Sequence, residues 1–111
     1  MVSQTLQQEV SQLEANFCSA LSDPTRILML YALSESPRNV TELTNELGIS
    51  QPTASRHLKV LRERGLVQTT RQGTTVTYHL ADTRLVQALD ILRAVMRDQL
   101  THQASLVNEI S

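Results

Sequence analysis

The sequence predicts a single, mainly α-helical domain with a small β-hairpin. Residues 39–64 have the pattern of a short helix, a tight turn and a longer basic helix. Residues 66–80 follow as two runs rich in Thr, Val, Leu and Tyr, joined across Gly73 as in a hairpin. Apolar residues at helical spacing outside this segment predict three further helices. The whole chain, 1–111, therefore fits one winged helix-turn-helix domain with five helices and a two-stranded wing.

The first helix is expected over residues 5–21, with one apolar stripe on an otherwise polar surface. The stripe residues are spaced by three or four positions: Leu6, Val10, Leu13, Phe17 and Leu21. The next helix has a clear start, because Asp23 can cap it and Pro24 is favoured at the first helical position. This second helix is apolar on most sides, so we expect it at the centre of the core. Arg26 on it could face outward or brace the fold.

The helix-turn-helix at 39–64 is predicted from its helix ends. Asn39 and Glu42, three residues apart, form the capping-box pattern that begins a helix. Gly48 can adopt the left-handed conformation that ends this helix. Ser50 can cap the following helix, and Pro52 is tolerated in its first turn because amides there lack intrahelical partners.

The basic helix, residues 51–64, has two chemically different faces. Ala54, Leu58 and Leu61 fall on one side, with His57 near them and expected to hydrogen-bond within the domain. Polar and cationic side chains cover the other faces: Gln51, Thr53, Ser55, Arg56, Lys59 and Arg62. Hydroxyl groups and Arg can bond base edges in a DNA major groove, and Lys can meet phosphates. The alternative is an ordinary solvated amphipathic helix.

The hairpin directly after this helix favours DNA recognition over that alternative. Its strands are expected at 66–71 and 75–80, joined across residues 71–74. A helix in the major groove and a wing beside it can reach two features of one duplex. Arg71 and Gln72 are the wing residues placed to touch phosphate or the groove floor.

Charge is concentrated on the same segment, although the formal net charge of the chain is −1. Residues 50–81 contain five cationic side chains and only one acid, Glu63. The acidic residues lie mainly before and after this segment. A concentrated positive face on a nearly neutral molecule is what phosphate contact requires, and a dimer would double it.

Three stretches carry a family resemblance: LSDPTRILML at 21–30, ELTNELGISQPTASRHLKVLRERGLV at 42–67 and the RQGTTVTYHL hairpin at 71–80. Together they resemble the ArsR/SmtB family of winged helix-turn-helix repressors, over roughly residues 17–89. The resemblance implies a homodimer that binds double-stranded operator DNA. It also implies that the DNA is released when an inducer, often a metal ion, binds.

The first and last helices are the expected dimer interface. The last helix, capped by Asp82 and reaching to residue 108, carries apolar residues at alternating spacings of four and three. That pattern can join two helices, and the resemblance places the first helix at the same interface. We therefore expect dimerisation through residues 1–21 and 82–108. The predicted interface residues are Leu6, Val10, Leu13, Leu85, Leu89, Leu92 and Met96.

The metal sites that the resemblance implies lack most of their ligands here. One site has an Asp-x-His pair at the start of the last helix, but Asp82 is followed by Arg84, and we expect a salt bridge between them. Val95 stands at a second His position, which leaves Asp82, Asp98 and His102 as candidate ligands. The other site needs Cys-x-Cys, and residues 42–47 hold no thiol. No cofactor is predicted, and a divalent metal or another inducer stays open.

Cys18 is the single cysteine, so an internal disulfide is excluded and a reducing cytoplasm fits. Its place beside the apolar stripe favours a small buried residue, with a redox or metal-thiolate role as the alternative. The polar first ten residues lack the regions of a secretory signal, and no run of about 18 apolar residues could span a membrane. We therefore expect a cytoplasmic protein without a membrane partner.

The function classes can be separated by what the chain lacks. It has no glycine-rich phosphate loop and no recognisable Ser–His or Cys–His pairing, so an enzyme is not expected. A protein- or RNA-interaction module without operator DNA binding is the alternative. RNA readers commonly present aromatic platforms, but the only aromatic residues, Phe17, Tyr31 and Tyr78, lie outside the basic helix. The sequence thus favours a sequence-specific DNA-binding regulator, and the resemblance makes it a repressor.

Overall fold

The computed structural model describes the backbone of residues 1–110 and the side chains of residues 1–108. In chain order its elements are α1 (Gln4–Leu13), the π-helical turn η1 (Glu14–Cys18), α2 (Pro24–Glu35), α3 (Val40–Leu47), α4 (Gln51–Glu63), β1 (Val67–Gln72), β2 (Thr75–Leu80) and α5 (Arg84–Ile110). The described residues thus form the five helices and the two-stranded antiparallel wing expected from the sequence.

The core is built around α2, as predicted. Met29 and Leu30 of α2 are fully buried, and they belong to one apolar cluster with Leu43 of α3 and Leu58 and Leu61 of α4. Burial of each such side chain contributes about 1.5–3 kcal/mol relative to leaving it in water. Because α3 and α4 both pack on this cluster, the core fixes the helix-turn-helix as one rigid unit.

The predicted helix starts are present. Asp23 accepts a hydrogen bond from the Thr25 amide at 2.7 Å. Asn39 and Glu42 form the reciprocal capping box, with donor–acceptor distances of 2.8 and 3.0 Å. Gly48 ends α3 with a φ of 66°, a conformation that costs most residues energy because their Cβ crowds the backbone.

The wing is anchored at its base. Its turn is shorter than expected, because β1 continues through Gln72 and pairs it with Thr75, which leaves only Gly73 and Thr74 in the turn. At the other end, the backbones of Arg38 and Tyr78 exchange hydrogen bonds of 3.0 and 2.8 Å. The linker between α2 and α3 is therefore tied to β2.

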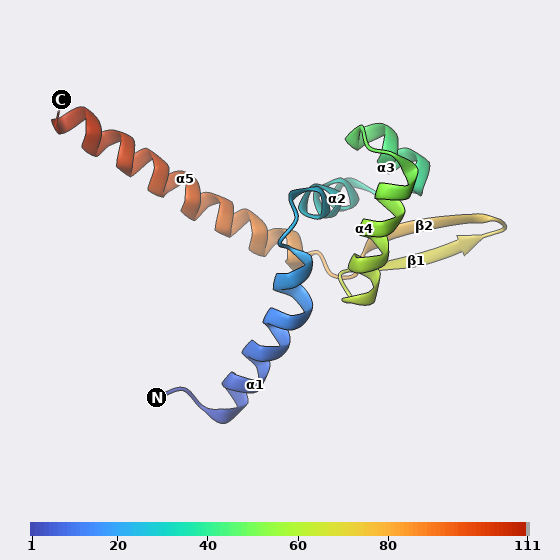
Figure 1. Ribbon diagram of the computed structural model, residues 1–111, viewed down its shortest axis with the longest axis horizontal. Coiled ribbons are helices and arrows are strands. Elements are labelled where there is room, and N and C mark those ends of the chain that lie inside the picture. Colours follow the sequence, from blue (N-terminus) through green and yellow to red (C-terminus); the bar gives the residue numbers. More distant parts are fainter. Residues whose placement is uncertain (111) are drawn as a thin grey trace.

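The two terminal helices extend away from this body in different directions (Figure 1). The first helix is not the regular helix expected over 5–21. It is α-helical to Leu13, widens into the π-helical turn η1, and continues helical to residue 20. Phe17 packs against the core from this turn, and Ala20 just after it is fully buried. The earlier apolar residues of α1, including Leu13 at 50% exposure, lie against no part of the core.

Cys18 is exposed, so the expectation of a small buried residue is wrong for the single chain. Phe17 and Leu21 occupy the positions that pack on the core. Cys18 follows Phe17 at the end of the π-helical turn and lies on another side of the helix, toward solvent.

The predicted apolar seam of α5 divides between two surroundings. Leu85 and Leu89 pack on the core of their own chain, and Leu89 is only 8% exposed. Leu92, at 64% exposure, and Met96 lie beyond the core with their side chains uncovered. Among the described helices, none is both long enough and apolar enough to cross a membrane.

Candidate nucleic-acid interface

The cap of α4 arranges the first residues of the predicted groove-facing set. Ser50 accepts a hydrogen bond from the Thr53 amide at 3.3 Å, and its hydroxyl donates to the Thr53 hydroxyl oxygen at 2.8 Å. Thr53 is accordingly half-buried and one lone pair of its hydroxyl is occupied, whereas Gln51 is exposed. The Thr53 hydroxyl can still donate its proton outward, but it has fewer hydrogen bonds left to make with a ligand than a free side chain has.

The two faces of α4 are separated as the sequence predicts. Ala54, Leu58 and Leu61 are fully buried against the core. The side chains predicted to reach DNA lie outside it and are exposed: Gln51, Ser55, Arg56, Lys59 and Arg62. The one acid near them, Glu63, is 4.0 Å from the Lys59 ammonium, and this exposed pair is too weak to immobilise the lysine. The cations of α4 are therefore available to a polyanion.

A hollow lies next to this helix on the wing side. Ser55, Lys59, Arg62 and Glu63 of α4 line it together with Tyr78 of β2, and its volume is about 420 Å³. Two cations on one wall give this hollow a chemistry suited to an anionic backbone. The hollow therefore lies between the exposed face of α4 and the wing.

Arg71 and Gln72 lie at the far end of β1, beside the turn, and both are exposed. The wing projects from the body next to α4 (Figure 1). Helix and wing thus present cationic and amide groups from the same part of the molecule. A duplex in contact with α4 has the wing beside it.

His57 lies on the buried side of α4, at 9% exposure. Its Nδ1 atom is 3.2 Å from the Arg26 guanidinium, which confirms the expected hydrogen bond within the domain. Since Arg can only donate, Nδ1 is the acceptor in this contact. Arg26 also donates to the backbone carbonyls of Ala20 and Ser19, at 2.6 and 3.4 Å, so it braces the fold.

The candidate metal ligands do not come together. The Asp82 carboxylate is bound by the Arg84 guanidinium at 2.7 Å, the salt bridge expected from the sequence, and this hydrogen bond lowers the pKa of Asp82 to about 2. Asp98 and His102 are exposed on α5. Within the part of the chain that the structure describes, no three His, Cys, Asp or Glu side chains form a group that could hold a metal.

The terminal helices carry features that apolar spacing alone did not reveal. Ile91 and Val95 are exposed on α5 in addition to the residues of the predicted seam, which can extend to Leu100, itself exposed. Projected at 100° per residue, Ile91 and Val95 form a second stripe next to Leu92 and Met96, so the uncovered apolar face is wide. A helical projection would have found it, whereas the four-and-three spacing follows a single seam.

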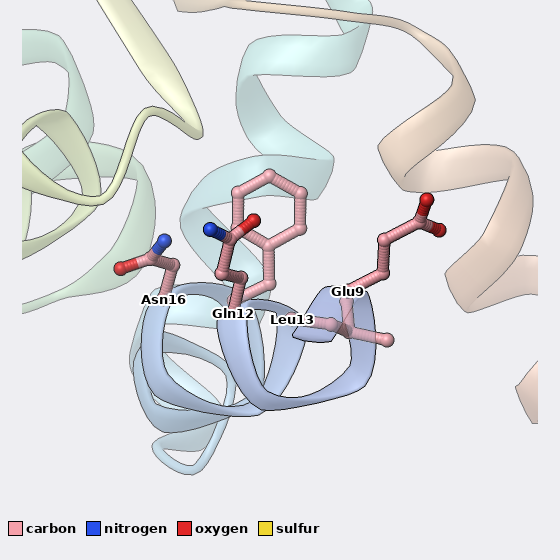
Figure 2. Close-up of a pocket in the computed structure, with 5 residues that line it drawn as sticks. Glu9, Gln12, Leu13 and Asn16 are labelled. Carbon is pink, nitrogen blue, oxygen red and sulfur yellow. The ribbon is translucent and has the colours of Figure 1, made fainter. Parts of the chain in front are cut away.

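A shallow hollow of about 290 Å³ lies along the first helix. Figure 2 shows Glu9, Gln12 and Asn16 rising from one side of the helix around it, and Leu13 and Phe17 are its apolar lining. Apolar side chains flanked by polar ones are also found at protein–protein interfaces.

Comparison with known proteins agrees with this geometry. The family model described as bacterial regulatory protein, arsR family, matches residues 23–69. The chain is 36% identical over 85 residues to the biofilm growth-associated repressor of Xylella fastidiosa, covering 77% of this chain and 75% of that protein. It is 34% identical over 84 residues to a probable mercury resistance operon repressor of Streptomyces lividans, covering 76% and 67% of the two chains.

A solved structure extends the similarity to three dimensions. It is the homodimeric winged helix-turn-helix DNA-binding domain of Mb0332 from Mycobacterium bovis, described as a possible ArsR-family transcriptional regulator. The TM-score is 0.77 at 27% identity, with 91% of this chain and 93% of that chain covered.

Proposed function

The chain belongs to the ArsR family of bacterial regulatory proteins, and we propose that it is a homodimeric, sequence-specific repressor that binds double-stranded operator DNA in the cytoplasm. Membership of a family of transcription regulators also agrees with the expectation that the chain is not an enzyme. The observation that carries the proposal is the division of α4 into a buried apolar back and an exposed front of hydroxyl and cationic groups.

In the proposed complex, α4 enters the major groove. Ser55 and Arg56 meet base edges, with Gln51 and the Thr53 hydroxyl near the helix start. Lys59 and Arg62, on the wall of the hollow beside the wing, contact the phosphate backbone. Arg71 and Gln72 at the wing tip reach the neighbouring backbone or minor groove.

The proposed dimer covers the exposed apolar side chains of α1 and α5. Leu6, Val10 and Leu13 of α1 and Leu92 and Met96 of α5 are about half exposed or more in the single chain. Contiguous exposed apolar side chains on a helix mark a surface that packs against a partner. Ile91 and Val95 widen the proposed interface, whereas Leu85 and Leu89 contribute mainly to the core of their own chain.

The metal inducer implied by the family resemblance is not supported at the predicted ligands of a single chain. Asp82 is already neutralised by Arg84, and Asp98 and His102 are oxygen and nitrogen donors without a third partner in the described residues. A divalent metal therefore enters the proposal only as one of the inducers to be tested, with no ligand set assigned. A relative is named for mercury resistance, so Cys18, exposed on the first helix, is the residue to control when metals are tested.

The proposed function is tested by selecting duplexes from a random pool with the purified full chain, then measuring binding by gel shift. We expect a palindromic site with half-sites about one helical turn, or a multiple of it, apart. Single strands of the same sequence and structured RNA are the competing ligands. Selection of no duplex sequence, or tighter binding to RNA, would favour the interaction-module alternative. Release from the selected duplex is then scored with a metal and oxidant panel, using Cys18→Ser as the control.

A further inference from the structure

The direction of α1 relative to the body is set by a small junction at its C-terminal end. The first ten residues of the helix, Gln4–Leu13, are exposed along their length and bury no side chain. Contact with the core begins only at Phe17, in the π-helical turn. Whatever holds residues 14–20 in place therefore determines where the rest of the helix points.

Two arginines hold this junction. Arg26 of α2 donates to the carbonyls of Ala20 and Ser19, at 2.6 and 3.4 Å, and to Nδ1 of His57 in α4, at 3.2 Å. Arg64, at the end of α4, donates to the carbonyl of Ala15 at 3.2 Å. A planar guanidinium with five fixed donors can lock several groups in one geometry, which a lysine cannot do. Helix α4, the proposed recognition helix, is thus tied to the end of the first helix at two separate points.

Small changes at this junction are amplified over the length of the helix. Residues 4–20 span about 25 Å, so a tilt of about 10° moves the far end by about 4 Å. That displacement is comparable to one base-pair step of about 3.4 Å along DNA. In a dimer formed through α1 and α5, such a tilt changes the separation of the two recognition helices.

We propose that Arg26 and Arg64 are positioning residues that fix α1 relative to α4 and thereby set the half-site spacing that the dimer selects. This inference rests on the proposed function. Neither residue has to touch DNA for this role. Arg26 is half-buried between α2, α4 and the end of the first helix, on the side of α4 opposite to Ser55 and Lys59.

The test uses the duplex selected by the wild-type chain and a series in which its half-sites are moved apart or together by single base pairs. The wild type should prefer its own spacing. Arg26→Lys keeps the charge but loses the planar guanidinium with its several fixed donors. We expect the ratio of affinities for the selected spacing and its neighbours to fall by about tenfold. The control is Arg38→Lys, the same substitution at an arginine that bonds Glu46 and the Ser36 carbonyl, away from the first helix. It should keep the wild-type preference.

Arg64→Ala decides the question if Arg26→Lys does not fold, because Arg64 is exposed and its loss leaves no cavity. We expect a weakened spacing preference, with the salt dependence of binding unchanged. If the slope of log affinity against log salt concentration fell by about one, Arg64 would be a phosphate contact, and its positioning role would be overturned. Equal loss of affinity at every spacing, or a wild-type preference in both variants, would overturn the inference as a whole. If the wild type selects no duplex, the proposed function itself fails.

Discussion

The body of the molecule and its two projecting helices differ in how far their apolar residues are buried. In the body, α2, α3, α4 and the wing close around fully buried side chains such as Leu30 and Leu58. In α1 and the outer half of α5, apolar side chains at the same spacing remain uncovered, among them Leu13 and Leu92. One region is complete within a single chain, and the other needs a second surface. Stability and assembly are therefore separable properties of this fold.

The largest expected effect is in the body. Leu58→Ala should lower the free energy of unfolding by about 2–5 kcal/mol, because a fully buried side chain on the back of α4 leaves a cavity. Urea-induced unfolding followed by circular dichroism measures the change. A loss below about 1 kcal/mol would mean that the core around α4 can collapse into the space, contrary to its proposed rigidity.

The next effect separates assembly from folding. Leu92→Asp should weaken the dimer and lower operator affinity by at least about tenfold, because a charge replaces a side chain that we propose to be buried between subunits. Helix content should be unchanged, since Leu92 is 64% exposed in the single chain. Sedimentation velocity over a concentration series measures the assembly state. Gln8→Glu on the polar side of α1 is the control, and a wild-type dimer in Leu92→Asp would break the comparison.

A smaller effect divides the front of α4. Arg56→Ala should cost about 1–3 kcal/mol for the selected site and little for unrelated duplexes, if Arg56 reads a base. Lys59→Ala should weaken all duplexes alike and reduce the salt slope by about one. Fluorescence anisotropy at several salt concentrations distinguishes the two. Wild-type binding by both variants would remove α4 from the interface.

The smallest effect concerns the start of α5. Arg84 holds the pKa of Asp82 at about 2, below its ordinary value of 3.8. A lowered pKa in the folded state gives stability that is complete above the ordinary value and is lost as pH falls toward the folded value. Asp82→Asn should therefore lower the melting temperature slightly at neutral pH, and the difference from wild type should shrink between pH about 4 and about 2. A difference that is constant with pH would contradict the proposed role of the ionised carboxylate.

Local chemistry made the body predictable from sequence. The capping box at Asn39 and Glu42 and the left-handed Gly48 each involve residues within a few positions of one another, and all three are as expected. The salt bridge between Asp82 and Arg84 is local as well.

Features fixed by distant contacts were not predictable. The π-helical turn at 14–18 has no local sequence signal that we recognised, and its carbonyls are bound by Arg64 and, just beyond it, by Arg26. Cys18, the last residue of that turn, is exposed. The four-and-three spacing of α5 correctly marked apolar residues, but it could not show that Leu89 meets its own core while Leu92 does not.

The hydrogen bonds between the backbones of Arg38 and Tyr78 join the wing directly to the segment that precedes the helix-turn-helix. Any force on the hairpin from a bound duplex is transmitted to the linker before α3 and not absorbed by a loose hinge. The tip at Gly73 and Thr74 lies outside this clamp, with open space around Gly73. Extra residues inserted at the tip would therefore change only the length of the wing. A single residue inserted beside Arg38 would instead displace the helix-turn-helix and the wing together.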